Sequence, residues 1–274
     1  HYTAWSYTAA GTLASIQLAV LLVIDEFGLL GWGLFMLLLA SLAVLGWRES
    51  AIRRAGGFAT ALALLLLAMW TPSGRDFALV AGGIALLAGV VPAALARFGR
   101  AGEEDRWQAI LVPPLLAAIA TLHFHAGEGV QMLLALGMLT LGALAVGAAV
   151  IFERAAAVER FAWGHAGAIA LIAYLALVSL LPNVAIGWSL ALLAAALLLA
   201  LPKRPHTALA LLLIAAGWAV PVIATWFFAL TPALLGIPAS AGELPSPASV
   251  ANRIMPVVLL SLIHISEPTR LGMI

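Results

Sequence analysis

The sequence predicts an all-α, polytopic transmembrane bundle built from repeated helical hairpins. Three observations predict this fold class. Hydrophobic residues make up 64% of the 274 residues and charged residues only 9%, whereas soluble domains are roughly 45–50% apolar and about 25% charged. The apolar residues form long uninterrupted runs, and the basic residues gather in every second connection between those runs.

A helix needs about 20 mainly apolar residues to cross a bilayer. Continuous runs favour helices over a barrel, whose strands alternate lipid-facing and lumen-facing residues. The first two runs, 4–24 and 28–47, are separated by the short acidic turn Asp25–Phe27. The next two, 55–71 and 78–96, are separated by a slightly longer turn, so each pair predicts a tight hairpin.

The same pattern continues along the chain, and nine runs in all are long enough to span a membrane. The remaining five runs cover residues 108–124, 130–151, 162–181, 184–201 and 207–230. A tenth run begins at Ile254 and reaches only Ile263, about 15 Å of helix. The sequence therefore predicts nine spans and a truncated tenth.

The basic residues predict the orientation of these spans. Ten of the thirteen lie in the connections after the second, fourth, sixth and eighth runs: Arg48, Arg53, Arg54, Arg97, Arg100, Arg106, Arg154, Arg160, Lys203 and Arg204. Basic connections stay in the cytoplasm, so the N-terminal end is predicted to be cytoplasmic too. These connections recur about every 50 residues, a period that corresponds to one hairpin.

Both ends of the sequence predict a piece of a longer protein. The chain begins with His1, and no charged segment precedes the first apolar run, unlike a signal peptide. The segment Ser261–Ile274, SLIHISEPTRLGMI, resembles translated sequencing-adapter read-through. A genuine re-entrant tail is the alternative. We therefore expect one transmembrane domain over residues 1–262 and a non-native tail over residues 263–274.

The composition also excludes several function classes. A net charge of +1 lacks the basic field that nucleic-acid binding requires. The absence of cysteine excludes disulfides and thiolate chemistry. No glycine-rich phosphate loop is found in a strand–helix context, so we expect no cofactor.

A candidate metal site lies after the fifth run, in the segment LHFHAGEG. In an extended segment His123 and His125 point the same way and can bind one metal with Glu128 as a third ligand. In a helix the two histidines face apart and the site fails. An ordinary polar loop or a pH-sensing histidine pair explains the same residues.

Asp25 and Glu26 are the weak catalytic candidates. An acidic pair after the first span resembles the outer-loop carboxylates of membrane glycosyltransferases. Those enzymes carry a long first outer loop, whereas here the turn is three residues, Asp25–Phe27. Two solvated carboxylates at a membrane surface are the alternative.

The remaining polar and small residues predict packing and orientation. No charged residue lies near the middle of a predicted span, which argues against a proton-coupled pump. The charged residues between the fourth and fifth runs are expected to be solvated, with Arg100 and Glu104 spaced for a helical pair. His165 is expected at the lipid headgroups, Pro92 at a kink, and glycines 137, 142 and 147 at close helix contacts. Four tryptophans are expected at the membrane surface: Trp47, Trp70, Trp107 and Trp163.

The many short Ala/Leu-rich spans, tight outer turns and Trp-Arg span exits such as Gly46-Trp47-Arg48 resemble one known family. It is a bacterial family of large predicted membrane proteins, domain-of-unknown-function family 2339 (DUF2339). The resemblance covers the chain to Leu262. It implies a bacterial inner-membrane protein, with further spans of a longer chain and the lipid bilayer as its partners. It implies no catalytic residues.

The uncharged interior favours a non-enzymatic function, as an envelope scaffold or a carrier of apolar or lipid-like cargo. The alternative is an outer-face enzyme that acts on a lipid-linked substrate through Asp25, His123, His125 or Glu128. An enzyme requires at least two of these groups to converge on one cavity.

Overall fold

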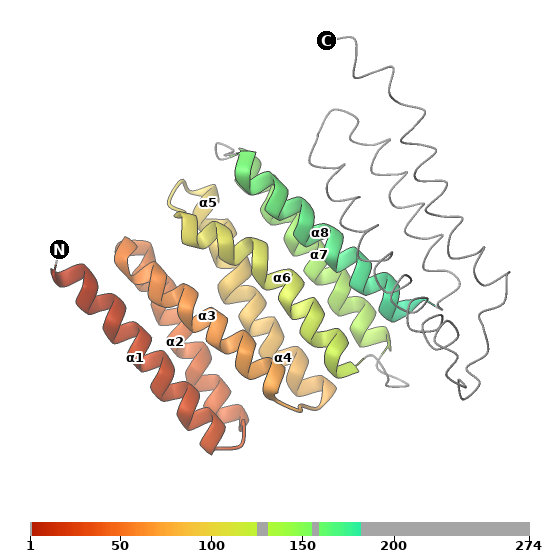
Figure 1. Ribbon diagram of the computed structural model, residues 1–274, viewed down its shortest axis with the longest axis horizontal. Coiled ribbons are helices and arrows are strands. Elements are labelled where there is room, and N and C mark those ends of the chain that lie inside the picture. The colour runs from red at the N-terminus through yellow and green to blue at the C-terminus, as the bar shows by residue number, and fades with distance from the viewer. Residues whose placement is uncertain (1, 125–130, 155–158, 182–274) are drawn as a thin grey trace, which may run out of the picture. The chain divides into compact units, whose positions relative to one another are not determined.

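The computed structural model of the protein describes residues 2–124, 131–154 and 159–181 (Figure 1). These residues form only helices: α1 (Tyr2–Ile24), α2 (Leu29–Arg48), α3 (Ser50–Met69), α4 (Gly74–Ile84), the π-helix η1 (Ala85–Val90), α5 (Val91–Arg97), α6 (Glu103–Phe124), α7 (Gln131–Arg154) and α8 (Glu159–Leu180). The chain divides into two units, His1–Ala176 and Leu177–Ile274. The packing described below is that of the first unit.

Six of the described helices are long and apolar enough to cross a membrane: α1, α2, α3, the continuous helix α4–η1–α5, α6 and α7. The apolar part of α8, Gly164–Leu180, is shorter. These helices coincide with the first seven predicted runs. The eighth, ninth and tenth runs lie outside the described residues, as does the segment 261–274. The count of nine spans, the domain 1–262 and the tail 263–274 therefore stay predictions.

The helices extend beyond the apolar runs that predicted them. Helix α3 begins at Ser50 rather than at residue 55, and α6 begins at Glu103 rather than at residue 108. Arginine and glutamate are good helix formers, so the helix continues through charged residues that end an apolar run. The extension brings Arg53 and Asp105 into helices.

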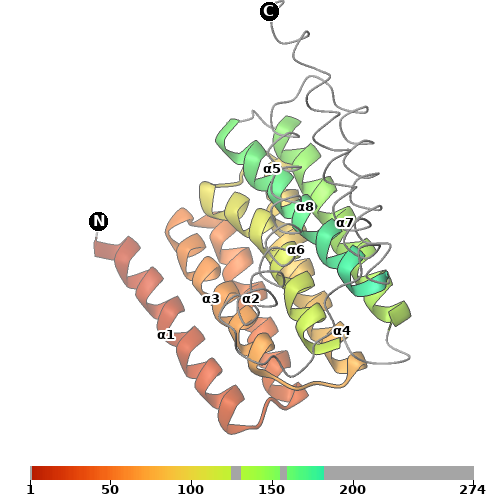
Figure 2. The same cartoon turned by 45° about the vertical axis from the view of Figure 1, so that its right-hand side comes forward.

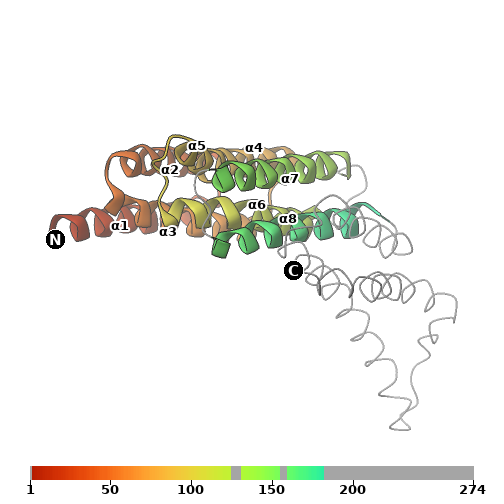
Figure 3. The same ribbon diagram turned by 90° about the horizontal axis from the view of Figure 1, so that it is seen from above.

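The first unit consists of two layers of helices (Figure 3). Helices α1, α3, α6 and α8 form one layer, and α2, α4–η1–α5 and α7 form the other. Consecutive helices alternate between the layers, so each hairpin crosses from one layer to the other. Within a layer α3 packs between α1 and α6 (Figures 1 and 2). The described residues thus form an array of repeated hairpins, as predicted.

The core lies between the layers and is deepest around α6. In the most apolar stretch of α6 half of the residues are buried, compared with 22% in the corresponding stretches of α1 and α7. The largest fully buried side chains include Trp32, Phe35, Leu67 and Leu116. Outward-facing positions carry leucine and other large apolar side chains, as expected of helices whose outer faces meet lipid.

Two of the tryptophans expected at the membrane surface are half-exposed, Trp47 and Trp107. Trp70 is not: only 9% of it is exposed, and its ring lies 5.4 Å from that of Trp32. Trp70 directly follows the last residue of α3 and packs against a tryptophan of α2, so burial of the indole overrides its preference for the interface. The side chain of Trp163 lies outside the described residues.

The predicted distortion at Pro92 takes the form of the π-helix η1, which ends two residues before it. Proline has no N–H to donate to the preceding turn, and its ring crowds the backbone there. Widening the turn from α to π geometry accommodates both effects, and the amide of Val91 then bonds to the carbonyl of Leu86. Helices α4 and α5 continue on either side without a break.

Among the described residues, the glycines of α7 do not make the close helix contacts that were predicted for them. No described atom lies within 4 Å of a Cβ placed on Gly137 or Gly147, and Gly142 meets only Ile172, at 3.9 Å. Close approaches lie at other glycines. A Cβ on Gly11 of α1 would lie 2.8 Å from that of Ala55 in α3, and Cβ atoms on Gly31 of α2 and Gly89 of η1 would lie 2.7 and 2.8 Å from leucine side chains of α1 and α7. A repeat of glycines marks places where helices are able to approach, but the partner helix decides which ones are used.

Candidate functional site

Polar contacts gather at the end of the unit that contains Glu49 and residues 98–102, called here the basic end. At its centre the guanidinium of Arg53 in α3 lies 3.5 Å from the carboxylate of Asp105 in α6. Arg53 also donates hydrogen bonds to the carbonyls of Gly46, at 3.0 Å, and Arg100, at 2.7 Å. One side chain thus joins the end of α2, the α5–α6 connection and the start of α6.

Asp105 is held by its own local structure as well. It is the third residue of α6, and its carboxylate accepts a hydrogen bond of 2.6 Å from the amide of Gly102. This is one half of a capping box, in which the third helical residue bonds back to the cap residue. Only 6% of Asp105 is exposed, so its negative charge relies on Arg53 and Gly102.

The expectation that these charged residues are solvated is therefore wrong for Asp105. The predicted pair between Arg100 and Glu104 does not form either: Glu104 lies 3.4 Å from Arg54 instead. Residues 98–102 leave the helix, because Gly99 adopts a left-handed conformation with φ +69° and ends α5. Arg100 and Glu104 therefore do not lie one turn apart on the same helix.

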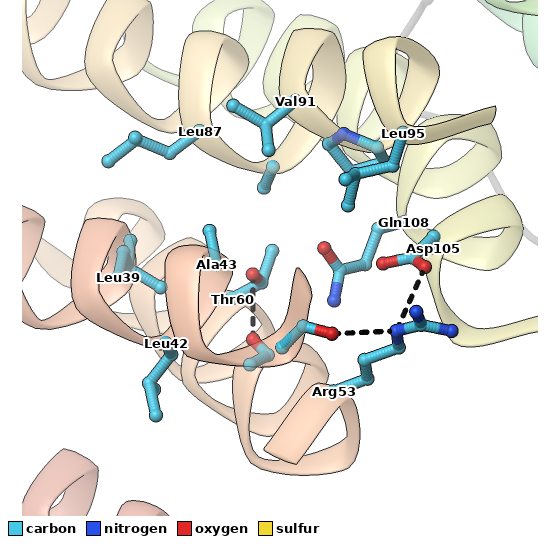
Figure 4. Close-up of a pocket in the computed structure, with 14 residues that line it drawn as sticks. Leu39, Leu42, Ala43, Arg53, Thr60, Leu87, Val91, Leu95, Asp105 and Gln108 are labelled. Atoms are coloured by element: carbon cyan, nitrogen blue, oxygen red, sulfur yellow. Dashed lines mark hydrogen bonds and ion pairs between the residues drawn. The ribbon is translucent and has the colours of Figure 1, made fainter. Parts of the chain in front are cut away.

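A groove lies beside the Arg53–Asp105 pair (Figure 4). Its walls are apolar side chains of α2 and of η1–α5, and its floor comes from α3 and α6. We call it the α2–α5 groove, and it is lined by Leu39, Leu42, Ala43, Gly46, Arg53, Gly56, Thr60, Leu87, Ala88, Val91, Pro92, Leu95, Asp105 and Gln108. The space enclosed at its centre is about 30 Å³, enough for one or two water molecules.

The polar groups on the groove floor differ in their partners. The hydroxyl of Thr60 donates to the carbonyl of Gly56, at 2.9 Å. The carboxamide of Gln108 lies against Gly57, in a space that a side chain at that glycine would enter. Gln108 makes no side-chain hydrogen bond to a described residue, so its amide is available to a molecule in the groove.

Arginines at the basic end also stack on aromatic rings. The guanidinium of Arg100 lies 5.5 Å from the ring of Trp47. That of Arg106 lies 5.5 Å from Phe152 and 5.4 Å from Phe161. Such stacks hold arginine at the boundary between apolar and polar surroundings.

The sequence predicted that His165 meets the lipid headgroups, whereas its side chain is buried, with 6% exposed. Its ring lies 5.7 Å from that of Phe152, and no described residue is within hydrogen-bonding distance of its Nε2 atom. Because α8 begins at Glu159, His165 lies inside the helix and within the packed region rather than at its surface.

The opposite end of the unit contains the predicted catalytic candidates Asp25 and Glu26. Both are exposed. Their turn forms a Schellman motif: the amide of Phe27 bonds to the carbonyl of Leu22 at 2.9 Å, and that of Glu26 to Val23 at 3.2 Å. Glu26 occupies the left-handed position of this motif, with φ 50°. The turn thus ends α1, a structural function for a residue whose catalytic function stays a prediction.

His123 lies near the C-terminus of α6, inside the helix. Its Nε2 atom is 3.1 Å from the carbonyl of Leu67, in the last turn of α3, and its ring packs edge-on against Phe77. The last carbonyls of a helix have no partner within that helix, so His123 supplies one from a neighbouring hairpin. The metal hypothesis requires an extended segment, and at His123 the chain is helical instead.

His125 and Glu128 lie outside the described residues, so the three-ligand metal site stays a prediction. Among the described residues, no cluster of three metal-ligating side chains is found. No contact joins Asp25 or Glu26 to His123 in the described part of the chain, so the convergence that an enzyme requires stays a prediction as well.

The described helices define a class of protein: an all-helical array with six helices of membrane-spanning length and a polar cluster at one end. No known family, curated protein or solved structure matches the chain. The basic end was missed in the sequence because Arg53 and Asp105 lie 52 residues apart and outside the apolar runs. The one signal for it was the recurrence of charges on the same side of the hairpins.

Proposed function

We propose that the chain is a multi-pass integral membrane protein with a non-enzymatic scaffold function in a bacterial envelope. The observation that supports this proposal most is the distribution of polarity over the described helices. Large apolar side chains cover their outer faces, while charged side chains lie at the helix ends. Contact of such a surface with lipid hydrocarbon is favourable, whereas its contact with water is unfavourable.

The α2–α5 groove favours a scaffold over a carrier that encloses its cargo. The space at its centre, about 30 Å³, accommodates water but not a lipid-like molecule. The Arg53–Asp105 pair further ties three hairpins together at the basic end. A movement that separates these hairpins at the basic end would break this buried pair, which is costly.

Extraction of membranes that contain the full chain tests the membrane half of the proposal. We expect the protein to stay in the membrane pellet at alkaline carbonate and to enter solution only with detergent. Release by carbonate alone would overturn the assignment as an integral membrane protein.

Lipid movement tests the scaffold half. The full chain is reconstituted into phosphatidylcholine vesicles that carry a fluorescent phosphatidylcholine, and dithionite is used to bleach the outer leaflet. We expect inner-leaflet fluorescence to persist as long as in protein-free vesicles. Faster loss, in vesicles shown to stay sealed, would favour the lipid carrier instead.

A further inference from the structure

We propose that the α2–α5 groove is a binding site for water, in which one or two buried molecules bridge the carboxylate of Asp105 and the carboxamide of Gln108. The inference goes beyond the proposed scaffold function and does not depend on it. Three features of the described residues support it: an oxygen of Asp105 without a partner, an amide of Gln108 without a partner, and the size and charge of the space that both side chains line.

The carboxylate of Asp105 is buried with few hydrogen bonds. Its two contacts, with the amide of Gly102 at 2.6 Å and with the guanidinium of Arg53 at 3.5 Å, both involve Oδ2. No described residue donates a hydrogen bond to Oδ1, although only 6% of Asp105 is exposed. A carboxylate accepts about four hydrogen bonds, and a buried one is costly without them. A further donor is therefore expected at Oδ1.

Gln108 offers polar atoms on the same face of α6. It follows Asp105 by three residues, a spacing that places two side chains side by side on a helix. Its carboxamide makes no hydrogen bond with a described residue. In the view of Figure 4 this carboxamide lies between the carboxylate of Asp105 and the hydroxyl of Thr60, and all three line one space. A molecule in that space can thus contact both α6 and α3.

The space has the size that water requires. Its volume is about 30 Å³, whereas a buried water needs at least about 10–15 Å³ and about two to four polar partners. Asp105, Gln108 and Thr60 provide such partners on the groove floor. The remaining walls are mainly apolar, so the hydrogen bonds of the water are directed to the floor.

The charges around the space favour a neutral molecule over an ion. The guanidinium of Arg53 repels a cation, the carboxylate of Asp105 repels an anion, and the two charges balance each other. An ion would also lose most of its hydration in a space of this size, which is costly. Water donates to Oδ1 of Asp105 and both donates to and accepts from the carboxamide of Gln108. The buried carboxylate thereby gains the hydrogen bond that the described residues do not supply.

A crystal structure of the full chain, at a resolution that shows ordered solvent, tests the proposal directly. We expect electron density in the groove within about 2.5–3.2 Å of Asp105 Oδ1 and of the Gln108 carboxamide, the range of hydrogen bonds. A groove without density would overturn the proposal. Density surrounded by several oxygens at metal–ligand distances would also overturn it, because the occupant would then be a cation.

Stability provides a second test, because a hydrated and a dry groove predict different results for Gln108→Leu. In a hydrated groove the leucine leaves the water without a partner, so the variant should unfold at a lower mole fraction of SDS in mixed detergent micelles. In a dry groove the amide has no hydrogen bond to lose, and leucine would leave stability unchanged or raise it. That result would overturn the proposal. Gln131→Leu, at an exposed position of α7, is the matched control and should not change the unfolding midpoint.

Gly56→Ala tests the same site by filling it. A Cβ on Gly56, which lines the groove, meets only the Cβ of Leu42, at 4.0 Å, an ordinary contact. The added methyl group occupies space that water needs, so the variant should be less stable than Gly82→Ala, where no described atom lies within 4 Å. Both variants gain the helix propensity of alanine, so their difference reports on the groove. Equal or greater stability of Gly56→Ala would indicate an empty void that the methyl fills, and would contradict bound water.

Discussion

The residue with the most contacts at the basic end is Arg53, and its loss should be costly. In Arg53→Gln the carboxylate of Asp105 stays buried without its cation. Breaking a buried ion pair costs about 3 kcal/mol. We therefore expect the variant to unfold at a lower mole fraction of SDS in mixed detergent micelles. Arg54→Gln is the matched control, because the Arg54 side chain is 77% exposed and such pairs contribute less than about 1 kcal/mol.

A double variant distinguishes loss of the pair from loss of bulk. Arg53→Met/Asp105→Leu removes both charges and retains most of the volume. It should recover much of the stability lost in Arg53→Gln, since the unpaired charge is the main penalty. A double variant as unstable as the single one would show that the hydrogen bonds of these two side chains to backbone groups, those of Arg53 to Gly46 and Arg100 and that of Asp105 to Gly102, matter more than the pair.

Glu26 and Gly99 provide opposite tests of the same backbone conformation. Both adopt positive φ at a helix C-terminus, 50° and 69°, and no described atom lies within 4 Å of a Cβ at Gly99. Left-handed geometry costs a side-chain-bearing residue about 1 kcal/mol. Glu26→Gly should therefore raise the free energy of unfolding by up to that amount, and Gly99→Ala should lower it similarly, in the same SDS titration.

The same experiment shows whether the Glu26 side chain contributes to the turn. A gain in stability in Glu26→Gly fits a carboxylate that is dispensable for the turn. A loss of stability would show that the side chain has contacts of its own at this end of the unit, in contrast to its exposed position.

At the scale of elements, the contact between α1 and α3 includes one position, Gly11, where a side chain does not fit. In Gly11→Ala the new Cβ would lie 2.8 Å from the Cβ of Ala55, which has no flexible side chain to move aside. We expect a loss of about 2 kcal/mol from overpacking. In Gly33→Ala, the matched control on α2, no described atom is within 4 Å. There the better helix propensity of alanine should raise stability by up to about 1 kcal/mol.

The contact between α6 and α3 at the opposite end involves His123. His123→Phe retains an aromatic ring against Phe77 but loses the interaction with the Leu67 carbonyl. We expect a loss of about 1 kcal/mol, the net value of one hydrogen bond. Measured by SDS titration, the loss should be the same with zinc and with a chelator. Stabilisation by zinc that both His123→Phe and His125→Phe abolish would support the metal prediction instead.

How far the sequence predicts these elements depends on which physical property each sequence pattern reports. Apolar runs mark the part of a helix that meets hydrocarbon, so they predicted the described helices while missing the charged ends of α3 and α6. The Arg53–Asp105 pair could not be predicted from one sequence, because it requires the lateral order of the hairpins. The π-helix was foreseeable only as a distortion near Pro92, since the neighbouring packing decides its form.

For the whole molecule, the hairpin array and the charge distribution together predict a topology. The turn at Asp25–Phe27 and the N-cap Ser73 lie at one end of the unit, and Glu49 and Gly99 lie at the other. Arginines concentrate at the second end, and positive-inside bias predicts that this end is cytoplasmic. Single cysteines at these positions need no background removal, because the chain has no cysteine of its own.

In intact bacterial cells that express the full chain, a membrane-impermeant maleimide should label Glu26→Cys and Ser73→Cys but not Glu49→Cys or Gly99→Cys. All four should be labelled after the membrane is permeabilised, which controls for burial in the fold. The reverse pattern would contradict the predicted orientation but would still agree with the hairpin array. Labelling of Glu26→Cys and Glu49→Cys from the same side would contradict the array itself, because α2 would then not cross the membrane.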